Sequence, residues 1–143
     1  MRLQGEDLAR REAMVTLTKT GWGNDNPAYR QMFTSLYIPG GSAEQLGWWN
    51  DLQRVSTSPQ NAERLQRAIS TIDVSALLPQ VTVPTLVAHA RHDHVIAVTA
   101  GRELAEGIPG AQYLELDSEN HVLLEHEPAW PTFVAAARDF LRG

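Results

Sequence analysis

Hydrophobic positions change their spacing near the middle of the chain. In the first half, apolar residues recur every three or four positions, which is typical of amphipathic helices. In the second half, two short apolar runs alternate with helical segments, which is typical of strands joined by helices. The expected helices of the first half cover approximately residues 7–20, 27–38, 42–52 and 59–72.

Local signals fix where these helices begin. Asn26 is a candidate N-cap before Pro27, because proline suits the first helical position. Ser42 followed by Gln45 forms a capping-box pattern. Ser58-Pro59 opens the fourth helix, and its apolar side chains are expected on one face. These side chains are Ala62, Leu65, Ile69 and Ile72.

The second half predicts the order strand, helix, strand, helix. The strands are expected at residues 85–90 and 111–116, with a helix over 99–107 between them and a last helix from Pro128. Two strands joined by a helix are normally parallel, with a right-handed crossover. The predicted fold class is therefore α/β, with a helical first part followed by a strand-helix-strand-helix unit.

The predicted sheet is unusually small. Parallel sheets normally have more than two strands and are covered on both faces. No third strand is evident upstream of residue 85. Because an unpaired strand edge favours association, we expect self-association through the open edge, as a homodimer or a larger assembly.

Composition excludes several classes of protein. The chain has 143 residues, 43% of them hydrophobic, and a net charge of −5 with scattered basic residues. It is therefore expected to be globular and to make no direct nucleic-acid contact. No cysteine is present, which excludes disulfides and thiolate zinc sites. No apolar run approaches the roughly 20 residues of a membrane span, and a soluble cytoplasmic protein with no membrane contact is expected.

Two residues are candidates for catalysis. Asp93 follows the first predicted strand, and His121 lies in the polar loop after the second. An acid and a histidine placed in this way form two-thirds of a hydrolytic triad, in which the acid orients the histidine. The alternatives are an aspartate that caps its own turn and a solvent-exposed loop histidine.

Three histidines near Asp93 raise the question of a metal site. Strand alternation predicts that His89 lies on one face of the sheet, whereas His92 and His94 lie in a turn. Nothing in this spacing enforces a coordination geometry. We therefore expect no metal and no cofactor, and we expect His126, between two glutamates, to be a solvated loop residue.

Several motifs resemble the C-terminal end of the α/β-hydrolase fold. They are Pro84–His89, Asp93, Ile108–Ala111, Asn120-His121 and Pro128 with the last helix. Residues 1–80 resemble the helical cap of that fold, and residues 81–143 resemble its last two strands. Residues 21–27, 33–36 and 54–59 are similar to a bacterial subgroup fused to helix-turn-helix regulators or nucleotide cyclases. This resemblance implies Asp93 as the triad acid and His121 as the general base.

One motif of the α/β-hydrolases is missing. Their nucleophile lies in a Gly-x-Ser-x-Gly turn, and none of the seven serines here occupies that pattern; Gly40–Glu44 comes nearest but lacks the last glycine. The resemblance implies hydrolysis of small apolar esters or lactones by the complete fold, and a chain inactive on its own. The alternative is a non-catalytic ligand-sensing or interaction domain of a bacterial transcriptional regulator.

Overall fold

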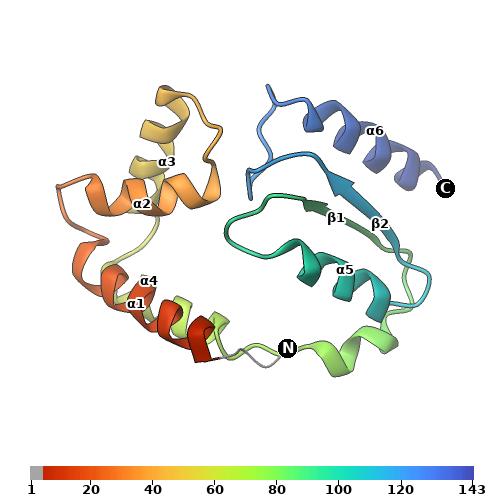
Figure 1. Cartoon of the computed structure of the whole chain (residues 1–143), viewed down its shortest axis with the longest axis horizontal. Coiled ribbons are helices and arrows are strands. Elements are labelled where there is room, and N and C mark those ends of the chain that lie inside the picture. The colour runs from red at the N-terminus through yellow and green to blue at the C-terminus, as the bar shows by residue number, and fades with distance from the viewer. Residues whose placement is uncertain (1–4) are drawn as a thin grey trace. The chain divides into compact units, whose positions relative to one another are not determined.

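The computed structural model describes residues 5–143, and its elements follow the predicted order (Figure 1). They are α1 (Gly5–Gly21), α2 (Ala28–Tyr37), α3 (Ala43–Ser56), α4 (Pro59–Ile69), the 3-10 helix η1 (Ser75–Gln80), β1 (Leu86–Ala90), α5 (Val98–Gly107), β2 (Gln112–Leu116) and α6 (Ala129–Arg142). The strands pair in parallel. The predicted α/β class is therefore confirmed.

The described chain forms two compact units. The first contains the chain up to Thr34 and Ser42–Asp73, and the second contains Ser35–Gly41 and Val74–Gly143. The last residues of α2 therefore belong to the second unit, which also contains the strands. These units are defined by packing, so the division into a cap-like part, residues 1–80, and a C-terminal part, residues 81–143, stays a prediction.

The helix caps of the first unit form as the sequence predicts. The Ser42 hydroxyl accepts from the Gln45 amide at 3.2 Å, and the Gln45 side chain accepts from the Ser42 amide at 2.9 Å. Ser58 caps α4 through the Asn61 amide. Asn26 Oδ1 accepts from the Ala28 amide at the start of α2. Each cap satisfies an amide that has no partner within its helix.

The buried side chains of the first unit include hydrogen-bonded polar groups. The Thr34 hydroxyl donates to Asn50 Oδ1 at 2.6 Å and accepts from Gln53 Nε2 at 2.7 Å. Of the apolar face predicted for α4, Ala62 is buried, but Leu65 and Ile69 are more than half exposed. Helical periodicity predicts that these side chains share a face, but it does not identify what covers that face.

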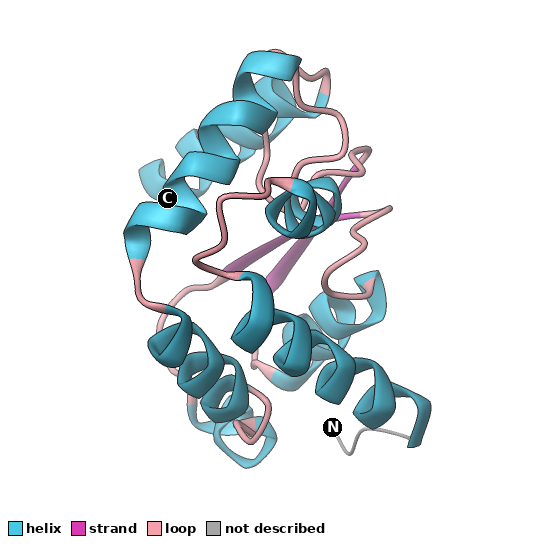
Figure 2. Ribbon diagram, turned by 90° about the vertical axis from the view of Figure 1, so that its left-hand side faces the viewer, coloured by secondary structure: helices cyan, strands magenta, loops and turns pink. Residues whose placement is uncertain are grey.

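The sheet of the second unit has a helix on each face (Figure 1). The register pairs Leu86 with Gln112 and Ala90 with Leu116. Leu86 and Ala88 each line a cavity together with residues of α6. His89, in contrast, lies against Gly101 of α5. Alternation along β1 therefore separates the side chains of the two faces. Figure 2 shows the two strands side by side.

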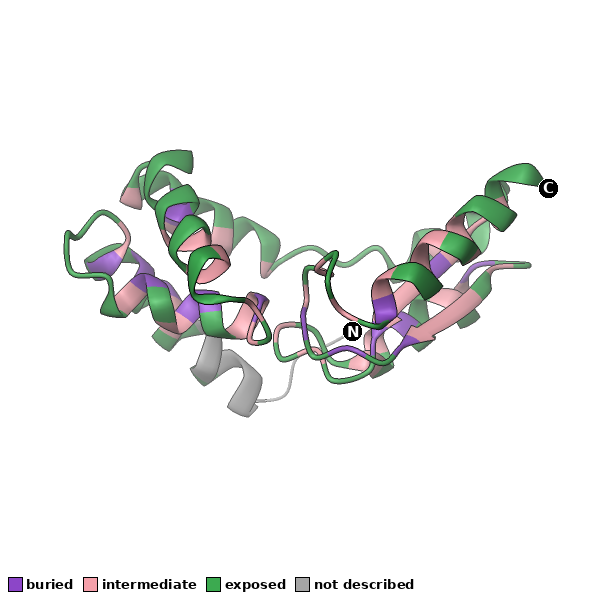
Figure 3. Ribbon diagram, turned by 90° about the horizontal axis from the view of Figure 1, so that it is seen from above, coloured by how far each residue is buried: buried purple, intermediate pink, exposed green. Residues whose placement is uncertain are grey.

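The second unit has a core of buried residues, coloured purple in Figure 3, and most of these residues are apolar. Its buried apolar residues are Ile38, Val87, Ala90, Ile108, Leu116 and Ala129. Most of them come from the strands and from the segments that join strands to helices. Burying such side chains is the main favourable contribution to folding.

An ionic cluster lies on the α5 face of the sheet. Glu115 Oε1 accepts from Arg91 Nε at 2.8 Å, and Glu115 Oε2 accepts from Arg102 Nη2 at 2.5 Å. These hydrogen bonds lower the pKa of Glu115 to about 2. The cluster joins the end of β1, α5 and β2.

No helix in residues 5–143 has both the length and the apolar character needed to cross a lipid bilayer.

Candidate acid–histidine site

Asp93 lies in the turn that follows β1. Its Oδ1 atom accepts from the amides of Val95 at 2.7 Å and Ile96 at 3.0 Å. The turn begins where the backbone of Arg91 donates to Leu116 and that of His92 donates to Ser118. Strand pairing therefore continues into the loops and fixes the acid turn beside the end of β2.

His121 lies in the loop between β2 and α6, which contains its own hydrogen-bond network. The buried Ser118 hydroxyl donates to Glu127 Oε2 and accepts from the Asn120 amide. The other oxygen of Glu127 accepts from the Leu124 amide. One carboxylate thus bridges the segments on both sides of His121.

The two predicted site residues are in direct contact. His121 Nδ1 lies 2.7 Å from Asp93 Oδ2, with the Asp93 side chain 3% exposed and the His121 side chain 27% exposed. An ionised carboxylate can only accept, so Nδ1 carries the proton and donates. In a neutral imidazole this leaves Nε2 as an acceptor, which is the tautomer that a general base requires.

The surroundings of Asp93 favour its charged form. Burial by itself raises the pKa of Asp93, but hydrogen bonds from His121 and from the Ile96 and Val95 amides, with the charge of His121, outweigh burial. The pKa of Asp93 therefore lies below its ordinary value. Near neutral pH the acid is ionised and can hold the imidazole in one orientation.

A segment that the sequence did not point to lies against the histidine loop. The Tyr37 ring meets the His121 ring edge-on, with centroids 5.2 Å apart. The Tyr37 carbonyl accepts from Val122, and Asn120 Oδ1 accepts from the Gly40 amide at 2.9 Å. A Cβ on Gly40 would lie 3.1 Å from Asn120 Nδ2, so glycine permits this close approach.

Tyr37 also lies within electrostatic range of the acid. Burial raises the pKa of the Tyr37 hydroxyl, and the negative charge of Asp93 raises it further. The tyrosine ring shields one side of the imidazole. In the sequence, the signal near this position is Pro39-Gly40-Gly41, which predicts the end of a helix and gives no information about a contact with a distant loop.

The three histidines near the acid have separate surroundings. His89 Nε2 lies 3.6 Å from Asp93 Oδ2, in a side chain that is 14% exposed. His92 and His94 are exposed residues of the turn. Among the residues that the structure describes, no group of three or more histidine, aspartate or glutamate side chains could hold a metal ion.

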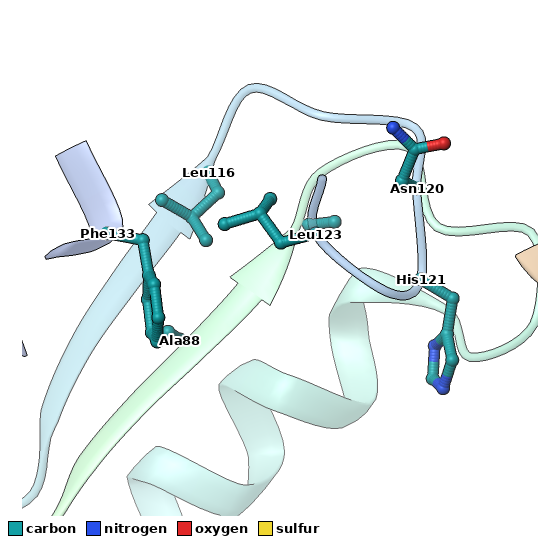
Figure 4. Close-up of a pocket in the computed structure, with 7 residues that line it drawn as sticks. Ala88, Leu116, Asn120, His121, Leu123 and Phe133 are labelled. Atoms are coloured by element: carbon teal, nitrogen blue, oxygen red, sulfur yellow. The ribbon is translucent and has the colours of Figure 1, made fainter. Parts of the chain in front are cut away.

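A small cavity lies at the carboxyl ends of the strands (Figure 4). Its volume is about 120 Å³, below the roughly 300–1,000 Å³ of typical ligand pockets. The lining residues are Ala88, Ala90, Leu116, Asn120, His121, Leu123 and Phe133. This cavity therefore gathers apolar side chains near the histidine, but it is too small for most ligands.

Comparison with known proteins gives matches among solved structures. No family model and no curated protein sequence matches the chain. A hydrolase from Oleispira antarctica matches 96% of the chain, with a TM-score of 0.75 and 19% identity over 50% of its own length. An esterase from Exiguobacterium antarcticum matches 94%, with a TM-score of 0.78 and 18% identity over 48% of its own length.

An enol-lactonase from Burkholderia xenovorans LB400 matches 92% of the chain, with a TM-score of 0.74 and 23% identity over 50% of its own length. The chain thus spans about half the length of each of these structures. At such identities, the likeness concerns the fold. It agrees with the parallel strands, the flanking helices and the loops at their carboxyl ends. The chain therefore has a partial α/β-hydrolase fold.

Proposed function

We propose that this chain supplies the acid and the general base of an acyl hydrolase, whose nucleophile comes from sequence outside the 143 residues. The observation that carries this proposal is the 2.7 Å contact between His121 Nδ1 and Asp93 Oδ2. In this geometry the unprotonated Nε2 can take a proton from an attacking hydroxyl, and the imidazolium can return it to the leaving group. Asp93 fixes the tautomer and stabilises the imidazolium.

The proposed substrates are small, apolar esters or lactones. Support comes from the apolar residues beside His121, namely Ala88, Leu123 and Phe133, and from structural neighbours described as an esterase and an enol-lactonase. The sequence contains no Gly-x-Ser-x-Gly turn. An acid and a base have nothing to activate without a nucleophile, so we infer that the 143-residue chain is inactive by itself.

A nitrophenyl-ester assay tests this function. The 143-residue chain is compared with the longest natural chain that contains it. We expect hydrolysis by the longer chain alone, and a loss of about 10⁴-fold in kcat when Asp93→Asn or His121→Ala is introduced there. Equal hydrolysis by the short chain, or full activity of the longer His121→Ala chain, would contradict the proposal.

A second candidate is a ligand-sensing domain of a bacterial transcriptional regulator. The absence of the nucleophile turn favours it, because a fold that has lost catalysis can still bind ligands. Binding of an ester or lactone by the longer chain, without turnover, would support sensing. Turnover that depends on His121 would support the enzyme.

We propose that the isolated chain associates with a second copy of itself. In the described residues the sheet has two strands, so the outer edge of β1 has no strand beside it. A second copy that pairs there would satisfy the backbone groups of this edge. Light scattering should then show a dimer or a larger species, and a monomer at high concentration would contradict this.

A further inference from the structure

His89 occupies a constrained position between β1 and α5. Gly101 of α5 lies directly against its ring: a Cβ added to this glycine would lie 2.6 Å from His89 Nδ1 and 2.7 Å from Cγ. Real Cβ atoms essentially never approach other atoms so closely. The glycine therefore provides the space for the imidazole, and the helix determines where the ring lies.

The other ring nitrogen of His89 reaches the acid turn. His89 Nε2 lies 3.1 Å from the carbonyl oxygen of Ile96 and 3.6 Å from Asp93 Oδ2. A carbonyl oxygen can only accept, so Nε2 carries a proton and donates to Ile96. The shorter distance makes this carbonyl the main acceptor, and the contact with Asp93 is beyond hydrogen-bond length.

Ile96 is also one of the two residues whose amides hold Asp93. Its N–H donates to Asp93 Oδ1 at 3.0 Å. His89 thus anchors, through a carbonyl, the same residue that orients the carboxylate through an amide. With Oδ1 occupied by the two amides, Oδ2 is directed at His121 Nδ1 at 2.7 Å. The chain of contacts runs from α5 through His89 and the turn to the acid–histidine pair.

We propose that His89 is a positioning residue for the Asp93–His121 pair. Its Nε2–H holds the turn so that Asp93 presents Oδ2 to His121, and Gly101 holds the His89 ring in place. This inference rests on the proposed function, since the pair matters for catalysis only if His121 acts as a base. It assigns a structural reason to a histidine that lies outside the histidine loop.

Three variants separate the hydrogen bond of His89 from its bulk. His89→Leu removes the donor, whereas His89→Gln keeps an N–H near the position of Nε2. Gly101→Ala displaces the ring without changing His89. The matched control is His92→Leu, because the His92 side chain is 61% exposed and lies in the turn that contains Asp93.

The measurement is the NMR signal of the His121 Nδ1–H proton in the ¹⁵N-labelled chain, together with the ring nitrogen shifts that report its tautomer. We expect a low-field proton signal and one tautomer in the unaltered chain, in His89→Gln and in His92→Leu. We expect loss of the signal and mixed tautomers in His89→Leu and in Gly101→Ala. Amide signals of α1 and α6 show whether each variant is folded.

Two outcomes would overturn the inference. One is an unchanged His121 signal in folded His89→Leu. If that variant does not fold, an unchanged signal in Gly101→Ala has the same meaning. Asp93→Asn separates this failure from failure of the proposed function. An unchanged His121 signal in Asp93→Asn would contradict the Asp93–His121 pair itself. Loss of the signal in Asp93→Asn, with the signal retained in His89→Leu, would contradict only the positioning role of His89.

Discussion

The two units of the chain bury different kinds of side chain. The most deeply buried large residues of the first unit are Thr18 and Thr34, whereas the corresponding residue of the second unit is Ile38. In the first unit, Thr34 is bonded to Asn50 and Gln53. In the second, a two-stranded sheet packs between two helices, and most of the buried side chains are apolar. Hydrogen-bonded polar side chains therefore make up a larger part of the buried residues in the first unit than in the second.

This difference matters for the candidate site. Hydrogen bonds in a buried network contribute modestly when they are made and cost free energy when one partner is lost. Apolar packing is less directional and tolerates no cavity without a penalty. The acid and the histidine lie on the apolar unit, whose strands determine where their loops begin. Rigid strands are suited to holding a catalytic pair at a fixed distance.

The largest expected effect is on a buried isoleucine of the second unit. Ile38→Ala should lower the free energy of unfolding by about 2–5 kcal/mol, because it leaves a cavity at a side chain that is 1% exposed. Ile72→Ala is the matched control, since that isoleucine is 66% exposed, and we expect a change of about 0.5 kcal/mol or less. Urea denaturation measures both, and similar losses in the two variants would contradict the comparison.

A smaller effect is expected in the polar core of the first unit. Thr34→Val should cost about 1–3 kcal/mol, because it leaves the side chains of Asn50 and the buried Gln53 without this hydroxyl. Thr20→Val is the control, because the exposed Thr20 hydroxyl bonds only backbone carbonyls of its own helix. If Thr34→Val stabilises α1 and α4 against hydrogen exchange, the hydrogen-bond account of this unit is wrong.

A local effect is expected in the histidine loop. Glu127→Gln turns one of the two acceptor oxygens into an amide donor and leaves the other uncharged, so Ser118 and Leu124 both lose their charged partner. A hydrogen bond to a charged group contributes about 1.5–3 kcal/mol, so we expect the Leu124 amide to exchange about tenfold faster or more. Glu125→Gln makes the same charge change at an exposed position and should leave this rate unchanged. Equal rates in the two variants would show that Glu127 does not hold the loop.

The smallest effect is expected in the acid range. The pKa of Glu115 is lowered to about 2 by hydrogen bonds to Arg102 and Arg91. A carboxyl with a lowered pKa stabilises the folded state above its ordinary pKa, here 4.5, and this contribution is lost as the pH falls toward 2. Glu115→Gln should therefore flatten the decrease in stability between pH 4.5 and 2, as followed by urea denaturation. Glu103→Gln, at an exposed position of α5, should leave that slope nearly unchanged.

The sequence predicted the elements and the acid–histidine pair for a common reason. Caps such as Ser42 with Gln45 are local, and alternation or helical spacing is read over short windows. Asp93 and His121 could be placed together because the carboxyl ends of parallel strands lie at one edge of a sheet. That inference needed only the order of the elements, and the 2.7 Å contact agrees with it.

The remaining parts of the site depend on contacts between distant segments. The bond between Gly40 and Asn120 joins residues 80 positions apart, and no local pattern marks either partner. The sequence alone does not distinguish Glu127 from Glu125, because the hydrogen bonds of Glu127 to Ser118 and Leu124 depend on the folded loop. The sequence shows His89 only as a member of a histidine cluster, because strand alternation gives the face of a side chain but not the carbonyl that it meets.

The parallel register has a consequence for engineering. Since Ala90 is opposite Leu116, the acid turn and the histidine loop leave the sheet at the same level, whatever length of chain joins the strands. The exposed Pro109-Gly110 turn, where the glycine has a φ of +73°, lies at the opposite end of this connection. Extra residues, or a new pair of chain termini, can be introduced at that turn while the spacing between acid and imidazole is kept.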